Sequence, residues 1–438
     1  MAPFEQVNST FLAWLEVNGA TVSKSISLQD YSTEGAGRGV VASADIKKDE
    51  ELFSIPRPLL LSPETSEISK KMDLSSLEGW NPLMMCMIYE YCRGSGSHWK
   101  PYFDKIGKEE AESIFKEKLW PMISANPELF STQDQDEASF LKIFHRMGSL
   151  IMAYAFHDTL PGKDSDGDEN MGGDHNDEEE DDNDEEEEEE IVNVSMVPMA
   201  DMLNHKTGHN NARLFHEREC LRMVAIKPIK AGQQIYNTYG ELCNADLLRK
   251  YGFVDMPNSH NIAEISGESV VAKCTAADQA GKEEKVEWLL EQDGLEDYFI
   301  LEADDEIPEE LIGCAKILMM PIDEFKTTVL EGKKLPSTKL TVEVQKVLRE
   351  LFEEKLSEYA SSAKDDKVLL KQPAGSVPLN KRNAAIVRSG ERDIIQSVLE
   401  KVKKWRPPTP TPVASSGKHK GNAKGQHPNK GKKPYQKK

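Results

Sequence analysis

Apolar residues recur at intervals of three and four positions in three segments of the N-terminal part of the chain. These segments are residues 4–17, 83–91 and 140–154. The spacing places the apolar side chains on one face of a helix, so it predicts three amphipathic helices. Residues 34–55 instead alternate glycine-containing turns with short β-branched runs, a pattern that predicts strands joined by turns.

The C-terminal half changes from one pattern to the other. Residues 191–255 return to short strands and turns, and residues 269–274 (Ser-Val-Val-Ala-Lys-Cys) predict one last strand. Helical periodicity then continues in four segments, each with a suitable start. These are residues 285–295, 308–320, 340–359 and 382–405. The patterns therefore predict an α+β protein in which helices interrupt a β-rich region and a separate all-helical domain follows.

Two segments of biased composition hold much of the charge. The chain has 438 residues and a formal net charge of −22, and residues 164–190 supply 18 acidic side chains without a basic one. Such a segment has too few apolar residues to pack, which predicts a disordered loop interrupting a domain. Residues 401–438 carry 12 Lys or Arg and no acid, and after Trp405 they read as a disordered tail. The net charge alone therefore predicts neither nucleic-acid binding nor electrostatic steering.

Other features of the sequence narrow the class of protein. The chain has no apolar run long enough to span a bilayer, and its first 20 residues lack the basic flank and apolar block of a signal peptide. Its six cysteines are scattered without a C-x-x-C pair, which favours a reducing, intracellular compartment and argues against a cysteine-built zinc site. His205 and His209 have no third ligand nearby and Gly208 between them, so we expect no metal.

Glycine occurs at every second position of the segment that includes Gly35, Gly37 and Gly39. Alternate glycines allow the backbone to approach a ligand closely and to adopt positive φ. A β-branched run follows the segment, whereas a dinucleotide or ATP loop leads into a helix whose N-terminus receives the phosphate. Taken alone, the segment therefore predicts a glycine-rich hairpin turn.

Two further segments end in side chains that need partners. Residues 197–205 (Val-Pro-Met-Ala-Asp-Met-Leu-Asn-His) run from apolar residues directly into Asn204 and His205, and buried polar side chains are normally hydrogen-bonded. Tyr239 and Tyr251 each precede a glycine, so both hydroxyls could project from turns into one cavity. Taken alone, each feature also fits a structural role, as a satisfied histidine or as a core or interface tyrosine.

In this order, the motifs resemble the SET-domain lysine methyltransferases, and specifically the subgroup typified by the Rubisco large-subunit methyltransferase. The matching pieces are the glycine-rich segment at 37–42, Asp-Met-Leu-Asn-His at 201–205, Tyr239-Gly240, Tyr251-Gly252-Phe253 and residues 380–391. The resemblance covers residues 5–405 and extends to the fungal ribosomal-protein lysine methyltransferases. It implies a β-rich SET fold with a pseudoknot, split by a helical insert and followed by an all-α substrate-binding domain.

The resemblance also implies where these parts begin and end. They are an N-terminal helix with the first part of the SET domain (1–60), a helical insert (61–162), the acidic loop (163–190), the second part of the SET domain with the catalytic site (191–260), the substrate-binding domain (261–405) and the basic tail (406–438).

The implied activity is transfer of a methyl group from S-adenosylmethionine to a protein lysine. Tyr239 matches the tyrosine whose hydroxyl lies beside the target amine, and Tyr154 and Asp201 match positions at the lysine channel. The implied cofactor contacts are Ala36, Gly37, Arg38, Trp80, Asn204, His205 and Tyr251. In these relatives the glycine-rich loop meets the methionine end of the cofactor, the Asn-His pair lies at the pseudoknot, and the second tyrosine closes the pocket.

The implied substrate is a lysine of a large-subunit ribosomal protein, with non-histone nuclear proteins as the alternative. The acidic loop could attract a basic substrate or serve only as a solubilising loop. The basic tail suggests the nucleus and possibly also the cytoplasm. We expect a monomer that binds neither membranes nor specific nucleic-acid sequences.

Two other classes of function remain open from the sequence. A catalytically inactive SET-fold module would bind a lysine-bearing segment without modifying it, but Tyr239, Asn204 and His205 are all retained. An acidic histone or ribosomal-protein chaperone would depend on residues 164–190, so that deleting them would abolish function.

Overall fold

The computed structural model describes most of the chain in eight stretches. They are residues 4–32, 37–103, 119–130, 136–158, 193–275, 281–303, 306–373 and 375–407. The expected acidic loop at 163–190 and nearly all of the expected basic tail lie outside these stretches, so those two predictions stay untested.

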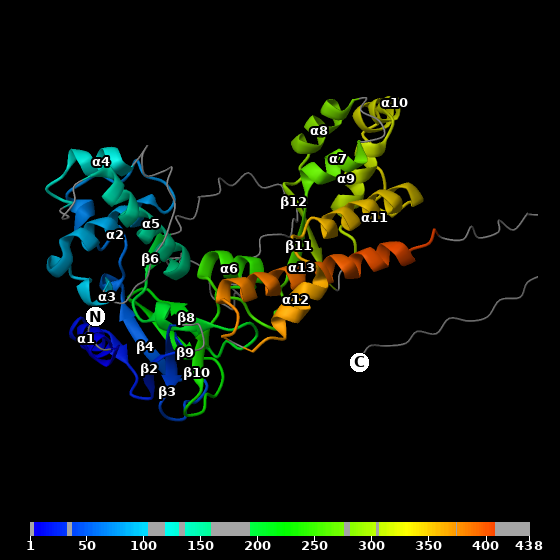
Figure 1. Ribbon diagram of the computed structural model, residues 1–438. Helices are drawn as coiled ribbons and strands as arrows, with labels where there is room; N and C mark the ends of the chain where they lie inside the picture. The colour runs from blue at the N-terminus through cyan, green and yellow to red at the C-terminus, as the bar shows by residue number, and fades with distance from the viewer. Residues whose placement is uncertain are drawn as a thin grey trace, which may run out of the picture.

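Two four-stranded sheets form the β-rich region (Figure 1). One has the order β1 (Thr21–Val22), β4 (Glu51–Pro56), β9 (Cys220–Ala225) and β8 (Ala212–His216). The other has the order β2 (Ile26–Asp30), β3 (Arg38–Ala42), β10 (Gln234–Asn237) and β7 (Asn204–His205). Each sheet joins strands from before and after the helical insert, so the two distant parts of the sequence build a single domain.

One pairing in these sheets is parallel. β10 pairs antiparallel with β3 on one side and parallel with β7 on the other, with Tyr236 opposite Asn204 and Asn237 opposite His205. The Asn-His pair is thereby fixed beside the strand that leads into Tyr239. This is the crossing of segments that the expected pseudoknot requires.

The three helices predicted from the N-terminal stripes are confirmed as α1 (Phe4–Val17), α2 (Asn81–Arg93) and α5 (Glu137–Tyr154). The short helices α3 (Lys100–Phe103) and α4 (Trp120–Ala125) complete the described part of the insert. Asp136 caps α5 by accepting the Ser139 backbone N–H at 3.0 Å. At its other end α5 runs directly into β5 (Ala155–Asp158), which pairs with β6 (Asn193–Met196), so Tyr154 lies at a fixed helix–strand junction.

The C-terminal region is mainly helical. Its helices are α7 (Gly267–Cys274), α8 (Lys282–Glu291), α9 (Glu309–Met319), α10 (Ile322–Glu324), α11 (Val342–Ser357), α12 (Ala363–Leu370) and α13 (Leu379–Lys404), with a π-helical turn at Phe325–Glu331. Four of them match the predicted helical segments. The structure also contains α12 and a two-stranded sheet of β11 (Ile262–Ser266) and β12 (Tyr298–Glu302). Neither was predicted from the sequence.

The predicted strand at 269–274 is wrong, because these residues form helix α7. Ser266 caps the helix by accepting the Ser269 backbone N–H, and Val270, Val271 and Cys274 are buried at helical spacing. A short apolar run with adjacent β-branched residues does not distinguish a strand from a buried helix, and here the packing against α9 and α11 decides for the helix.

Two separate hydrophobic cores support these regions. The first contains residues between Phe11 and Ile235, and the second contains residues between Ala263 and Val402. Helix α6 (Asn244–Tyr251) lies between them and contacts both α5 and α13 (Figure 1). None of the helices in the described stretches is long and apolar enough to cross a membrane.

Candidate active site

The predicted site residues gather around a cavity of about 440 Å³ in the β-rich domain. Eight of the ten line it: Gly37, Arg38, Tyr154, Asp201, Asn204, His205, Tyr239 and Tyr251. They come from the start of β3, the end of α5, the turn before β7, β7 itself, the segment after β10 and the end of α6. Ala36 lies outside the described residues. We call this the first cavity.

A second cavity, of about 430 Å³, adjoins the first. Five residues line both and therefore form the boundary between them: Ala153, Tyr154, Asp201, Tyr239 and Tyr251. Trp80 lines only the second cavity, where its side chain is partly exposed. Of the described residues that were expected to contact a cofactor, Trp80 is the one that does not line the first cavity.

Tyr239 lies at this boundary with a neutral hydroxyl. Its Oη donates a hydrogen bond to the Leu203 carbonyl at 2.9 Å. Its ring centroid lies 4.6 Å from that of Tyr251 and 5.3 Å from that of His205. Burial, reinforced by the charges of Tyr154, Tyr251 and Asp201, raises the pKa of Tyr239 far above its ordinary value. The phenol is therefore a hydrogen-bond donor at neutral pH, and not a base.

Asp201 is buried at the same boundary. It lies in a short 3-10 helix (Ala200–Met202) that follows Met199, whose φ of 78° is in the left-handed region that non-glycine residues rarely adopt. Its Oδ2 accepts a hydrogen bond from the hydroxyl of fully buried Tyr102 at 2.8 Å. Tyr102 could not be predicted from the sequence, because α3 is only one turn long and has no periodic pattern.

Two amide nitrogens in the first cavity lack a partner among the described residues. The Nδ2 atom of Asn204 and the Nε2 atom of Gln234 are both buried and make no hydrogen bond. Buried donors are normally satisfied, so these two are suited to a ligand that supplies acceptors. Gln234 was not among the predicted site residues, because nothing in its local sequence distinguishes it from an ordinary strand residue.

Arg38 brings a positive charge to the first cavity and is held by the N-terminal helix. Its Nε donates to the Asn8 side-chain oxygen at 3.1 Å, and its guanidinium carbon lies 5.1 Å from the centre of the Phe4 ring. Burial lowers the pKa of Arg38 from its ordinary value, which an arginine tolerates without losing its charge at neutral pH. The neighbouring Gly37 has a φ of 67°, as the glycine-rich segment predicted.

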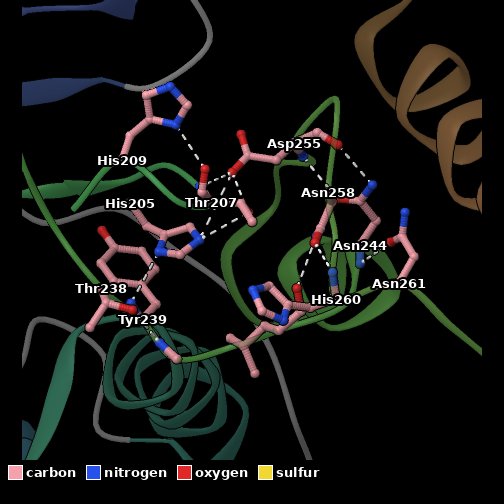
Figure 2. Close-up of polar contacts among 12 residues, drawn as sticks. His205, Thr207, His209, Thr238, Tyr239, Asn244, Asp255, Asn258, His260 and Asn261 are labelled. Atoms are coloured by element: carbon pink, nitrogen blue, oxygen red, sulfur yellow. Dashed lines mark hydrogen bonds and ion pairs between the residues drawn. The ribbon is translucent and has the colours of Figure 1, made fainter. Parts of the chain in front are cut away.

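The loop after α6 completes the cavity and is held by asparagines (Figure 2). Gly252 follows the last residue of α6 in the left-handed conformation typical of a glycine after a helix. Asn244, which is 2% exposed, clamps the loop: its Nδ2 donates to the Asp255 carbonyl and its Oδ1 accepts the Asp255 N–H, both at 2.8 Å. This clamp fixes the segment that carries Phe253, whose ring centroid is 6.3 Å from that of Tyr251.

We expect Asn244→Ala to lower the free energy of unfolding by about 3 kcal/mol, because it leaves the part-buried backbone N–H and C=O of Asp255 without the two bonds that Asn244 makes to them. Denaturant unfolding measures this. Asn126→Ala is the matched control, since the Asn126 side chain makes one bond, to the Met122 carbonyl at 2.9 Å, in the helical insert. The control should lose about 1 kcal/mol. Equal losses in both variants would contradict the clamp.

No group of three or more His, Cys, Asp or Glu side chains in the described part of the chain could hold a metal ion. His209, considered above with His205, lies with its Nδ1 2.8 Å from the Thr207 carbonyl, a local contact within its own loop.

Two protein families match parts of this chain, and known proteins match most of its length. The SET domain family matches residues 37–240, and the family described as Rubisco LSMT substrate-binding matches residues 276–395. The N-lysine methyltransferase setd6 of Xenopus tropicalis is 30% identical over 90% of this chain and 95% of its own. The N-lysine methyltransferase SETD6 of Bos taurus is 28% identical over 90% of this chain and 94% of its own.

Solved structures show the same fold. The SET domain of LSMT, in a crystal structure bound to lysine and AdoHcy, is 20% identical and superimposes with a TM-score of 0.64 over 91% of both chains. A structure of Rubisco LSMT bound to AdoMet gives a TM-score of 0.63 at 19% identity over 92% of both chains. The similarity covers the β-rich domain, its insert and the helical domain together.

Proposed function

This chain belongs to the SET-domain family of N-lysine methyltransferases, and on that basis we propose which ligand each of its two cavities binds. The first cavity holds S-adenosylmethionine, and the second admits the lysine side chain of a protein substrate. The observation that carries this division is the set of five residues that line both cavities, with Tyr239 among them. Two ligands that must exchange a group need such a shared boundary.

The side chains of the first cavity fit S-adenosylmethionine. Asn204 and Gln234 offer buried amide donors that lack partners, and Arg38 offers a cation for the carboxylate of the methionine part. Tyr251 and Phe253 supply aromatic surface for the apolar parts of the ligand. When bound, the cofactor supplies an electrophilic methyl group on a positively charged sulfonium. Ala36 remains a predicted contact outside the described residues.

The second cavity suits a lysine that must react as a neutral amine. A free lysine has a pKa of roughly 10.4 and is almost wholly charged at neutral pH. Enclosure between the aromatic rings of Tyr154 and Tyr239 disfavours the ammonium form by removing it from water. The oxygens of Tyr154, Tyr239 and Asp201 can then orient the amine, so that positioning supplies most of the rate.

Trp80 belongs, in this proposal, to the substrate side. Trp80 is 43% exposed as a residue and lines the second cavity but not the first. An exposed aromatic ring at the edge of a substrate cavity gives the residues flanking the target lysine a surface to pack against. This replaces the expectation that Trp80 contacts the cofactor.

The proposed target is a lysine of a large-subunit ribosomal protein, and a non-histone nuclear protein is the alternative. Two features of the sequence support a basic partner: the resemblance to fungal ribosomal-protein methyltransferases, and the 18 acidic residues between 164 and 190. Attraction between such a segment and a basic protein falls with added salt. The 12 basic residues between 401 and 438 support a location in the nucleus.

Purified large ribosomal subunits and S-adenosylmethionine with a labelled methyl group test the target. We expect the label to appear in one small basic ribosomal protein. Label that appears only in proteins of a nuclear extract would contradict the ribosomal target and favour the alternative.

A variant without residues 164–190 separates the enzyme from the acidic-chaperone class. We expect it to keep most of its methyl-transfer activity, with a weaker dependence on salt than the full chain shows. Complete loss of methyl transfer in a variant that is folded and binds S-adenosylmethionine would favour the chaperone class.

A further inference from the structure

We propose that Thr207 and Asp255 form a hydrogen-bonded relay that fixes the tautomer of His205 and, through it, the backbone of Tyr239. His205 and Asp255 also line the first cavity, whereas Thr207, which connects them, does not. The catalytic consequence of the relay rests on the proposed role of Tyr239, whereas its geometry does not.

Four contacts make up the relay (Figure 2). The Asp255 Oδ2 atom accepts from the Thr207 backbone N–H at 2.7 Å and from the Thr207 hydroxyl at 2.9 Å. The Thr207 hydroxyl oxygen lies 3.4 Å from Nε2 of His205. At the other side of the ring, Nδ1 of His205 accepts the backbone N–H of Tyr239 at 3.1 Å.

Two separate constraints then select the same tautomer of His205. Because the Tyr239 N–H donates to Nδ1, this nitrogen must be unprotonated. Because the single hydroxyl hydrogen of Thr207 is directed to Asp255, its oxygen can only accept from Nε2, which must therefore carry the proton. The carboxylate of Asp255 sets the direction of the hydroxyl and so determines the second constraint.

Burial keeps this ring neutral. The His205 side chain is 4% exposed, and burial is the main cause that lowers its pKa below the ordinary value of 6.5. The charged groups that face it are Asp255, which opposes this shift, and His260, which adds to it. Protonation would place a hydrogen on Nδ1 against the Tyr239 N–H. The relay is thus complete above pH 6.5 and is lost as the pH falls through the lowered pKa.

The carboxylate end of the relay is anchored. Asn244 bonds both the N–H and the C=O of Asp255, and the Asn258 side chain bonds Asn244 at 3.2 Å. These bonds hold the backbone of Asp255 independently of Thr207. Through this anchor the loop that carries Phe253 is joined to the segment after β7 that carries Thr207.

The test compares Thr207→Val, which removes the hydroxyl at nearly constant shape, with Thr207→Ser, which keeps it. Nitrogen NMR of histidine-labelled protein, with the His205 signals assigned by their absence in His205→Asn, reports the tautomer directly. We expect separate signals for a protonated Nε2 and an unprotonated Nδ1 in the wild type and in Thr207→Ser. In Thr207→Val the signals should move toward each other as both tautomers become populated.

The rate of methyl transfer should separate the two Thr207 variants in the same way as the NMR signals. We expect kcat for methyl transfer to fall about fivefold in Thr207→Val, as the loss of one hydrogen bond implies, and to stay within about twofold of the wild type in Thr207→Ser. Thr275→Val is the matched control, because that buried hydroxyl bonds the Val271 carbonyl in the helical domain, away from both cavities. It should change neither readout. If Thr207→Val does not fold, Asp255→Ala removes the other end of the relay and is measured in the same way.

Unchanged His205 nitrogen shifts in folded Thr207→Val, or equal shifts in Thr207→Val and Thr207→Ser away from the wild type, would overturn the relay. Because the shifts are measured without a substrate, they test the relay even if ribosomal subunits prove not to be the target. A wild type that is inactive on ribosomal subunits would therefore count against the proposed substrate. The nitrogen NMR spectra alone would then test the relay.

Discussion

Replacing Tyr239 by phenylalanine is expected to lower kcat for lysine methylation by about 100- to 1000-fold, while the Kd for S-adenosylmethionine changes by less than about threefold. The size of the first effect is that of removing one well-placed polar group from a preorganised site. The second effect is small because the ring remains, together with its packing at 4.6 Å against Tyr251. The hydroxyl is the only group lost.

The physical reason lies in the position of this hydroxyl at the boundary of the two cavities. It is neutral, since burial raises its pKa, and its bond to the Leu203 carbonyl at 2.9 Å holds it in one direction. A hydroxyl fixed in this way orients a neighbouring amine without removing its proton. Its loss should therefore affect the chemical step and not the binding of the cofactor.

Single-turnover kinetics with labelled cofactor, and calorimetry for the Kd, measure the two effects separately. Tyr89→Phe is the matched control, because Tyr89 is also buried and its hydroxyl accepts a bond from Lys71 at 2.6 Å in the helical insert. The control should keep wild-type kcat. A fully active Tyr239→Phe would remove Tyr239 from the mechanism.

The second large effect is expected from Gly39→Ala, which should raise the Kd for S-adenosylmethionine by about 10- to 100-fold. A Cβ atom at Gly39 would lie 2.4 Å from the Gln234 Nε2 atom, 2.8 Å from the Asn204 Nδ2 atom and 2.7 Å from the Tyr31 ring. The two amide groups must move, and they are the donors proposed for the cofactor. Losing two hydrogen bonds to the ligand accounts for the magnitude.

The same substitution should lower the free energy of unfolding by about 1–3 kcal/mol, because the buried Tyr31 ring must shift as well as the two amide groups. Gly96→Ala is the control, since a Cβ atom there meets nothing within 4 Å. We expect it to bind the cofactor as the wild type does. An unchanged Kd in Gly39→Ala would show that Asn204 and Gln234 do not contact the cofactor.

The long periodic helices could be predicted from the sequence alone. The stripe at residues 4–17 gave the bounds of α1, and the stripe at 140–154 lies within α5, because three or more turns of amphipathic pattern leave no competing structure. The run at 269–274 was too short for this, so its β-branched residues suggested a strand where packing gives helix α7. The β11–β12 pair was missed because each strand has only five residues and the paired residues are 32 or more positions apart.

The site could be predicted only where side chains belong to a motif. Asn204, His205, Tyr239 and Tyr251 were identified from short local patterns, and the structure brings all four to one cavity. Residues that act through tertiary contacts gave no local signal. Gln234 is an ordinary strand residue until β10 pairs with β3 and β7, and the sequence does not show that the loop after α6 returns to the segment that carries Thr207.

The central claim is that the cofactor and the lysine occupy different cavities that meet at Tyr239. A crystal structure of the protein with S-adenosylhomocysteine and a lysine-containing peptide tests it most directly. We predict that S-adenosylhomocysteine lies in the first cavity, with acceptors on the Asn204 and Gln234 amides, and that the lysine amine enters from the second cavity within hydrogen-bond distance of the Tyr239 hydroxyl. A lysine amine bound away from Tyr239, or both ligands in the same cavity, would contradict the account.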